Sequence, residues 1–305
     1  MTAAEVTTHD GLTLKAQVHG DEDAPLTVVL AHCWAADAED WHYQVQDLLD
    51  RYGHGVRVLT WDQRGHGRSD AAPRSACTVE NLGRDLGAVV DAFAPRGPLV
   101  LAGHSIGGMT LMTLPQLRPD LVERTRAVLF TSTSSGRLSE VTLGLPELGP
   151  LLKGQIPRVL GARAKLLSRK QRRQTPAIER FVVQRFLFGE PMRPRDAGLL
   201  VDQVINCPPA TMRGFYEDLM HHDRLADLTA YDGLPVVVLV GDRDLLTPPD
   251  HARRIAASIG SARLLVAPGA GHMLPLERNR LVSDQLIGLV ENALRADTAT
   301  GRPEA

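Results

Sequence analysis

Residues 98–107 read Pro-Leu-Val-Leu-Ala-Gly-His-Ser-Ile-Gly, an apolar run that leads directly into Gly-x-Ser-x-Gly. A strand that enters this pentapeptide and continues into a helix predicts a sharp turn with Ser105 at its tip. Glycine is expected at 103 and 107 because side chains there would collide with the neighbouring strand and helix. The turn would hold the serine hydroxyl clear of a sheet and let following backbone N–H groups face an oxyanion.

Short apolar runs recur on both sides of this stretch, at residues 26–31, 56–61, 127–131, 235–240 and 264–267. Continuous rather than alternating apolar runs are typical of strands covered on both faces of a parallel sheet. Helical patterns lie between several of them, at residues 78–93, 106–117, 251–259 and 279–295. Residues 6–18 alternate polar and apolar residues around Asp10-Gly11, which indicates a hairpin. The sequence therefore predicts an α/β fold with a mostly parallel central sheet flanked by helices.

The interval from Ser134 to Leu234 breaks this alternation, because it contains helix-like pieces and prolines but no convincing strand. A structureless loop of that length is implausible in a compact domain, so we expect an inserted helical cap or lid at 135–233. The α/β core then comprises residues 1–134 and 234–297, and residues 298–305 are expected to be a disordered tail. Basic residues crowd the middle of the cap between 158 and 185; we interpret them as solvated helix faces rather than an anion or membrane site.

Composition excludes several classes of function. The chain has 305 residues, 43% hydrophobic, and a formal net charge of -2, which gives no reason to expect a nucleic-acid partner. No apolar run approaches the ~20 residues that cross a bilayer, so stable membrane insertion is not expected. The first residues lack a secretory pattern, which favours a cytoplasmic location. Cys33, Cys77 and Cys207 are odd in number, far apart in sequence and form no Cys-x-x-Cys pair, so neither a disulfide framework nor a thiolate zinc site is indicated.

A serine nucleophile needs a base and an acid that orients the base. His272 follows the last apolar run in Gly-Ala-Gly-His-Met, and these glycines let the loop turn and present the imidazole. Asp244 follows the apolar run 235–240 in Gly-Asp-Arg-Asp and is the predicted acid. Asp242 is expected to brace that turn through local backbone hydrogen bonds. The alternative position for the acid, after residues 127–131, reads Ser-Thr-Ser and offers no carboxylate.

Four separated motifs together resemble the α/β-hydrolase fold superfamily, in its lipase- and esterase-like group of serine hydrolases with a helical cap. They are the loop at His32, residues 62–69 (Asp-Gln-Arg-Gly-His-Gly-Arg-Ser), the nucleophile elbow at 103–107, and the pair of loops at 241–244 and 269–272. The resemblance implies a catalytic triad of Ser105, Asp244 and His272 and needs no cofactor or metal. It implies that the backbone N–H groups of Trp34 and Ile106 form the oxyanion hole. It also places the activity among carboxylesterase- and lactonase-like enzymes of class EC 3.1.

Three further residues need separate interpretation. Cys33 stands where relatives usually carry glycine, and we interpret it as a small buried residue because no basic neighbour is evident to lower its pKa. His104 adjoins the nucleophile, but neighbouring residues on a sharp turn point apart, so a packing or hydrogen-bonding role is expected. Cys33 and His104 are also the candidates for contacting the substrate. Asp62 and Arg64 are expected to form a structural pair.

The resulting leading hypothesis is hydrolysis of a carboxylic ester, lactone or thioester of a small to medium-sized substrate through an acyl-enzyme. Similar triads also serve acyl transfer, perhydrolysis, carbon–carbon cleavage or cyclisation, and a cap that excludes water would favour transfer. A ligand receptor on this scaffold is a third hypothesis, which a complete triad disfavours. Serine at the elbow argues against dehalogenase and epoxide hydrolase chemistry, in which an aspartate stands there. The sequence indicates no oligomeric state.

Overall fold

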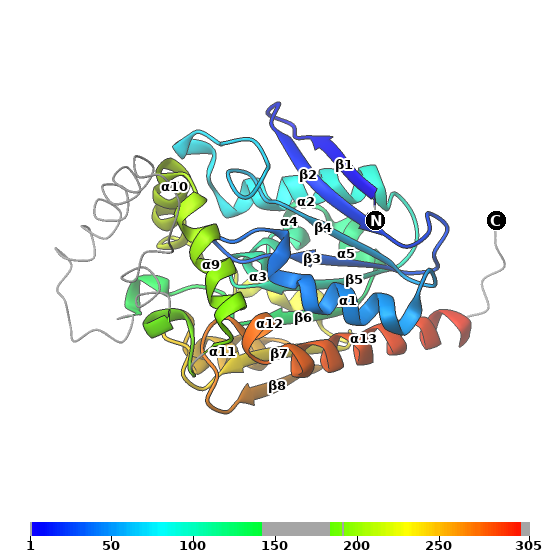
Figure 1. Ribbon diagram of the computed structural model, residues 1–305. Coiled ribbons are helices and arrows are strands. Elements are labelled where there is room, and N and C mark those ends of the chain that lie inside the picture. The colour runs from blue at the N-terminus through cyan, green and yellow to red at the C-terminus, as the bar shows by residue number, and fades with distance from the viewer. Residues whose placement is uncertain (1, 142–183, 191, 300–305) are drawn as a thin grey trace.

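The computed structural model describes residues 2–141, 184–190 and 192–299 (Figure 1). Its centre is an eight-stranded sheet in the order β1-β2-β4-β3-β5-β6-β7-β8. The strands are β1 (Thr2–Thr7), β2 (Thr13–His19), β3 (Thr27–Ala31), β4 (Arg57–Trp61), β5 (Leu99–His104), β6 (Thr125–Thr131), β7 (Val236–Gly241) and β8 (Ala262–Ala267). The β1–β2 and β2–β4 pairs are antiparallel and the remaining pairs are parallel, which confirms the predicted mostly parallel sheet.

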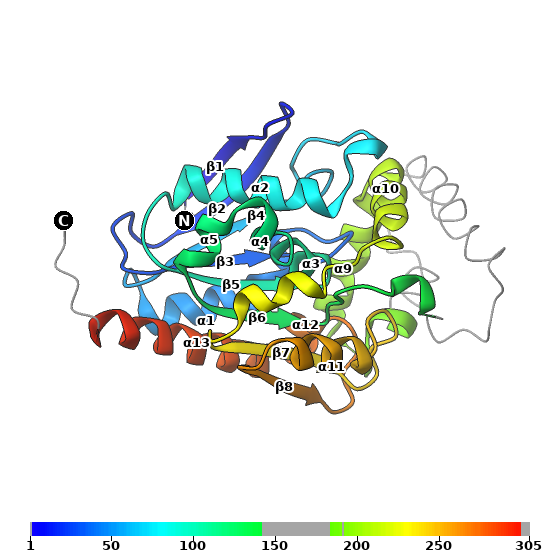
Figure 2. The ribbon, with the colours of Figure 1, turned by 180° about the vertical axis from the view of Figure 1, so that it is seen from behind.

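Helices cover both faces of this sheet. One face carries α1 (His42–Tyr52) and α13 (Asn279–Ala299), which lie in front of the strands in Figure 1. The other face, in front in Figure 2, carries α2 (Val79–Phe93), α4 (Leu114–Leu117), α5 (Pro119–Arg124) and α11 (Pro249–Ser258). The short helices α3 (Ile106–Leu111) and α12 (Leu274–Glu277) follow the loops at the carboxyl ends of β5 and β8. Four 3-10 turns complete the core: η1 (Ala38–Trp41), η2 (Arg74–Ala76), η3 (Leu138–Glu140) and η4 (Ala226–Tyr231).

The central strands are buried along their whole length because each supplies both hydrophobic cores. In β3, Val29 joins the core under α2 and α11, whereas Val28 and Leu30 join the core under α1 and α13. Successive strand side chains point to opposite faces, so a strand with helices on both sides must be apolar throughout. The edge strand β8 is less covered, and Val266 remains 39% exposed.

The helix predicted after the elbow is divided into two short helices. Residues 106–117 form α3 and α4, separated at Met112 and Thr113. The backbone N–H and the hydroxyl of Thr113 both donate to the carbonyl of Thr110, at 3.1 and 2.7 Å, which tightens the turn. Pro115 has no N–H to continue the first helix. The prediction of a single helix here is therefore wrong.

Where the structure describes it, the chain between β6 and β7 forms helices joined by turns, with an isolated bridge between Gly136 and Asp223. It contains α9 (Pro194–Asn206) and α10 (Pro209–Leu219), which lie across the end of the sheet from which α3 begins (Figure 1). Most of the basic stretch expected in this interval lies outside the described residues. Helix α13 includes residues 298 and 299, the first two of the expected tail, and the rest of that tail is also outside the described residues. None of the described helices is both long and apolar enough to cross a membrane.

The expected pair between Asp62 and Arg64 is wrong. Arg64 is fully buried and forms two bonds to Asp85 on α2, Nε–Oδ2 at 2.6 Å and Nη2–Oδ1 at 2.7 Å, with Asp10 as a second partner at 2.8 Å. Asp62 instead accepts the backbone N–H groups of Ala38 and Arg68, at 3.0 and 2.9 Å. Asp62 therefore holds the turn after β4, while Arg64 faces α2.

Candidate active site

The loops after β3, β5, β7 and β8 carry the predicted site residues. Carboxyl ends of parallel strands meet at one edge of a sheet, so these loops share that edge. Ser105 follows β5, Asp244 follows β7 and His272 follows β8, while Trp34 lies three residues beyond β3. Hydrogen bonds through His104, Asp40 and His272 connect all four segments.

The nucleophile elbow is strained. Ser105 has φ 54° and ψ -117°, a conformation that costs about 1–3 kcal/mol for a residue with a side chain. The turn is held because the Ser105 N–H donates to the carbonyl of Thr131 at 2.9 Å and the Thr133 hydroxyl donates to the Ser105 carbonyl at 2.6 Å. A Cβ at Gly107 would lie 2.1 Å from the carbonyl oxygen of Ala31. The predicted collision that demands glycine is thus present, with the strand β3.

Asp244 and His272 form the acid–base half of the site. The Nδ1 atom of His272 lies 3.0 and 2.9 Å from the two carboxylate oxygens of Asp244, and both side chains are buried. Burial raises the pKa of Asp244, but the imidazole and the hydrogen bonds from Thr247 outweigh it and leave that pKa below its usual value. The carboxylate can only accept, so Nδ1 carries the proton and Nε2 is free to accept a hydrogen bond, as the predicted role of base requires.

Thr247 is a site residue that the sequence did not single out. Its hydroxyl donates to Asp244 Oδ2 at 2.9 Å, and its backbone N–H donates to Asp244 Oδ1 at 2.9 Å together with the N–H of Leu246. The local backbone bonds expected of Asp242 are therefore made by the side chain of Asp244, and Asp242 is exposed. A threonine three residues after the acid was the only available signal.

His104 joins the elbow to the histidine loop. Its Nε2 lies 2.9 Å from the carbonyl oxygen of His272, and the two ring centroids are 5.2 Å apart. The expected hydrogen-bonding role of His104 is thus confirmed. No hydrogen bond joins the Ser105 hydroxyl to the His272 ring in the described part of the chain. Such bonds are often long in ligand-free sites and shorten in the reacting complex.

A segment of the chain between β6 and β7 also contacts the histidine loop. The backbone N–H of His272 donates to the carbonyl of Leu187 at 2.8 Å. A Cβ at Gly271 would lie 2.5 Å from the backbone nitrogen of Gly189. The Glu277 carboxylate accepts the N–H groups of both glycines, at 3.0 and 2.9 Å. Glycine at 271 is thus required by the close approach of this segment and not only by the turn that the sequence predicts.

The two predicted oxyanion donors have no acceptor in the described part of the chain. Neither the N–H of Trp34 nor the N–H of Ile106 bonds to any acceptor among the residues described. The loop that carries Trp34 is held by His32, whose Nδ1 lies 2.7 Å from the Cys33 carbonyl and whose Nε2 accepts the N–H of Gln63 at 2.8 Å. This pattern places the His32 proton on Nδ1.

The residues that could hold a metal are already engaged in other bonds. Cys33, Asp40 and His104 have potential ligand atoms within 4.8 Å of one another, the one such group in the described chain. Burial, reinforced by the Asp40 carboxylate, raises the pKa of the Cys33 thiol well above its usual value. Cys33 is 3% exposed, which confirms the interpretation as a small buried residue. His104 and Asp40 bond to each other at 2.7 Å, so the donor set fits an ion pair better than a metal.

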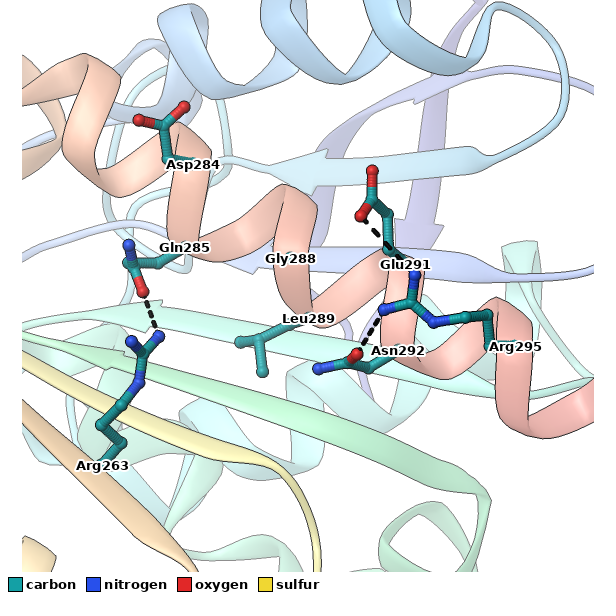
Figure 3. Close-up of a pocket in the computed structure, with 8 residues that line it drawn as sticks. All are labelled: Arg263, Asp284, Gln285, Gly288, Leu289, Glu291, Asn292 and Arg295. Atoms are coloured by element: carbon teal, nitrogen blue, oxygen red, sulfur yellow. Dashed lines mark hydrogen bonds and ion pairs between the residues drawn. The ribbon is translucent and has the colours of Figure 1, made fainter.

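A cavity of about 540 Å³ lies beside the acid loop. Its lining includes Asp244, Leu245 and His251, together with Arg137 and Glu140 from the η3 region. The candidate substrate contacts Cys33 and His104 do not line it. A second cavity, of about 330 Å³, lies between α13 and Arg263 of β8 (Figure 3). It holds no triad residue, and Arg263 there bonds to Gln285.

Comparison with known proteins adds a family and a fold. A model of the family described as "Alpha/beta hydrolase family" matches residues 28–285. The chain is 39% identical over 103 residues to a non-heme chloroperoxidase from Streptomyces lividans, which covers 34% of this chain and 35% of that protein. It is 36% identical over 109 residues to 3-oxoadipate enol-lactonase 1 of Acinetobacter baylyi, covering 36% of this chain and 38% of that one. The match spans little more than a third of either relative's length.

Among solved structures, a thermophilic esterase from Thermogutta terrifontis superposes with a TM-score of 0.74 at 23% identity. The superposition covers 96% of this chain and 99% of the esterase. At that identity the likeness concerns the fold, which is shared over almost the full length.

Proposed function

This chain belongs to the alpha/beta hydrolase family, and from that premise we propose that it is a serine hydrolase of carboxylic esters, lactones or thioesters. The observation that carries the proposal is the buried Asp244–His272 pair at the sheet edge where Ser105 occupies a strained turn. A strained serine and a histidine with its proton assigned by a carboxylate are the groups that acyl transfer needs. The enol-lactonase relative supports a lactone or ester carbonyl as the target.

In the proposed reaction, the Ser105 oxygen attacks the substrate carbonyl carbon and Nε2 of His272 takes the hydroxyl proton. Asp244 stabilises the imidazolium through Nδ1. The N–H groups of Trp34 and Ile106 hold the oxyanion, and each unpaired donor aimed at it is typically worth a factor of about 10²–10³ in kcat. The imidazolium then protonates the leaving group, and water releases the acyl group by the same steps in reverse.

We propose that residues 135–233 act as the cap and that the substrate is small to medium-sized. Helices α9 and α10 lie over the edge of the sheet that carries the triad (Figure 1). The cavity beside Asp244 has about 540 Å³, within the roughly 300–1,000 Å³ usual for small-molecule sites.

A second candidate keeps the acyl-enzyme and changes its acceptor. Similarity to a non-heme chloroperoxidase favours hydrogen peroxide in place of water, which would yield a peracid from the same acyl group. Acyl release measured with and without peroxide, on one ester substrate, separates the two. Faster release and peracid formation would favour the second candidate.

The test combines active-site labelling with an ester and lactone panel. A fluorophosphonate should label the wild type once, and Ser105→Ala should abolish both labelling and turnover. Ser135→Ala is the matched control, since it removes a different, fully buried hydroxyl that has no hydrogen-bond partner among the described residues. Turnover that survives in Ser105→Ala would refute the mechanism, and a chain that neither labels nor turns over any ester or lactone would favour the receptor hypothesis.

A further inference from the structure

Behind the nucleophile elbow, Asp40 and His104 form an ion pair that the proposed reaction does not use. Both side chains are 0% exposed, and Nδ1 of His104 lies 2.7 Å from Oδ2 of Asp40. Asp40 belongs to η1, shortly after the loop that carries Trp34. His104 is the last residue of β5 and directly precedes Ser105. The pair thus stands between two of the proposed catalytic segments.

The bonds of this pair reach three loops of the site. Asp40 Oδ2 accepts the backbone N–H of Cys33 at 3.0 Å, one residue before the proposed oxyanion donor Trp34. His104 Nε2 donates to the carbonyl oxygen of His272 at 2.9 Å. One carboxylate oxygen and one imidazole ring therefore connect the oxyanion loop, the elbow and the histidine loop.

The hydrogen bonds and the direction of both pKa shifts favour the charged form of the pair. A carbonyl oxygen only accepts, so Nε2 of His104 carries a proton, and the bond to the carboxylate places a second proton on Nδ1. Burial alone would lower the pKa of His104, but the Asp40 carboxylate raises it above its usual value. Burial likewise raises the pKa of Asp40, and the imidazolium lowers it further than burial raises it. Every bond in the network then has one donor and one acceptor.

We propose that Asp40 and His104 are positioning residues that hold Trp34, Ser105 and His272 in register for the tetrahedral intermediate. The inference rests on the proposed serine hydrolase function. An amide cannot replace Asp40 in either orientation. With its oxygen at the Oδ2 position it would accept both N–H groups without balancing the imidazolium charge, and with its NH2 group there it would leave both N–H groups unpaired. A buried donor left unpaired, or a charge left unbalanced, favours displacement of the loop that carries it.

Two isosteric variants separate the arms of the network. His104→Asn places an amide near Nδ1 and keeps the bond to Asp40, whereas His104→Gln places one near Nε2 and keeps the bond to the His272 carbonyl. We expect Asp40→Asn and both His104 variants to lower kcat about 10- to 100-fold with KM nearly unchanged, since displacing reacting groups by ~1 Å has that effect. Because the pair acts as a unit, Asp40→Asn/His104→Gln should be no slower than the slower single variant.

A reaction-state readout distinguishes positioning from folding. The Ser105 oxygen adds to the carbonyl carbon of a trifluoromethyl ketone and gives a tetrahedral adduct that resembles the intermediate. The affinity of the enzyme for this inhibitor should therefore fall in proportion to kcat/KM across the variants. Rates are normalised to sites titrated with a fluorophosphonate, so that unfolded protein does not count. Asp85→Asn is the matched control: it removes a 0% exposed carboxylate from the ion pair with Arg64, which does not reach the site loops. It should lower Tm and leave kcat per titrated site unchanged.

The inference is overturned if Asp40→Asn, His104→Asn and His104→Gln all keep the kcat and inhibitor affinity of Asp85→Asn. It is also overturned if the double variant is slower by the product of the two single effects. Full activity of Ser105→Ala in the same assay would instead refute the proposed function. An inactive Ser105→Ala beside fully active pair variants would refute the positioning role alone.

Discussion

Replacing Gly107 with alanine tests whether the elbow and the oxyanion loop share one rigid contact. The added Cβ would lie 2.1 Å from the carbonyl oxygen of Ala31, 2.6 Å from its carbonyl carbon and 2.8 Å from the carbonyl oxygen of His32. Real Cβ atoms essentially never come closer than 3.0 Å to another heavy atom, so the gap must open by the difference between 2.1 and 3.0 Å. The obstructing atoms are backbone, which cannot rotate away as a flexible side chain would.

The expected loss has two parts. Overpacking against a backbone that cannot yield should lower the free energy of unfolding by about 3 kcal/mol, the upper part of the usual range. A shift of about 1 Å in the segment leading to Trp34 should also lower kcat by about 100-fold, because transition-state geometry tolerates little displacement. Thermal or denaturant unfolding measures the first part and ester turnover per titrated site measures the second.

Gly288→Ala is the control, since a Cβ at that position in α13 meets nothing within 4 Å. Alanine in a helix interior should stabilise by about 0.5–1 kcal/mol relative to glycine. The reasoning fails if Gly107→Ala unfolds at the wild-type temperature with wild-type turnover. A stability loss with unchanged kcat would show that the oxyanion loop does not move with Ala31.

Three further predictions concern stability and the acid–base loops. Burial, and then the neighbouring His32, lower the pKa of His66 from 6.5 to about 3, so the unfolded chain binds a proton at a higher pH than the folded chain does. The free energy of unfolding should therefore fall by about 2 kcal/mol between pH 7 and pH 5. In denaturant titrations, His66→Asn should reduce this pH dependence by the same amount. Thr247→Val should reduce kcat/KM about tenfold because it removes a hydrogen bond to the Asp244 carboxylate, whereas Thr247→Ser should retain activity. If Thr247→Val and Thr247→Ser have the same kcat/KM, the bracing role is refuted. Glu277→Gln should lower the unfolding free energy by about 1–3 kcal/mol, because its NH2 group would face a backbone donor, whereas Glu291→Gln on the surface should change it little; equal Tm values for both would contradict this.

The sheet was predictable because its chemistry is local. Strands covered on both faces must be apolar throughout, as β5 is, and the glycines at 103 and 107 mark a turn that excludes side chains. The segments bearing Ser105, Asp244 and His272 could be found in a similar way, since each lies in the turn or loop after a largely apolar strand. Their pairing at one edge then follows from parallel strand order.

Partners that are distant in the chain left no comparable signal. Arg64 takes its two carboxylates from positions 10 and 85, and proximity in sequence wrongly suggested Asp62. Asp40 contacts His104 across 64 positions, and neither residue belongs to a motif that names the other. The break at Thr113 depends on a side-chain bond to Thr110 in a buried setting, which helical periodicity does not register.

The contact between Leu187 and His272 bears on how this scaffold can diversify. The backbone N–H of His272 bonds to a segment outside the sheet, so that segment helps to position the proposed base. A chimaera that imports a foreign lid should therefore rejoin the native chain before residue 187, keeping Gly189 against Gly271. A chimaera joined beyond residue 189 would replace both the lid and the segment that holds His272. Substrate preference can thus be changed without loss of activity only when the junction lies before residue 187.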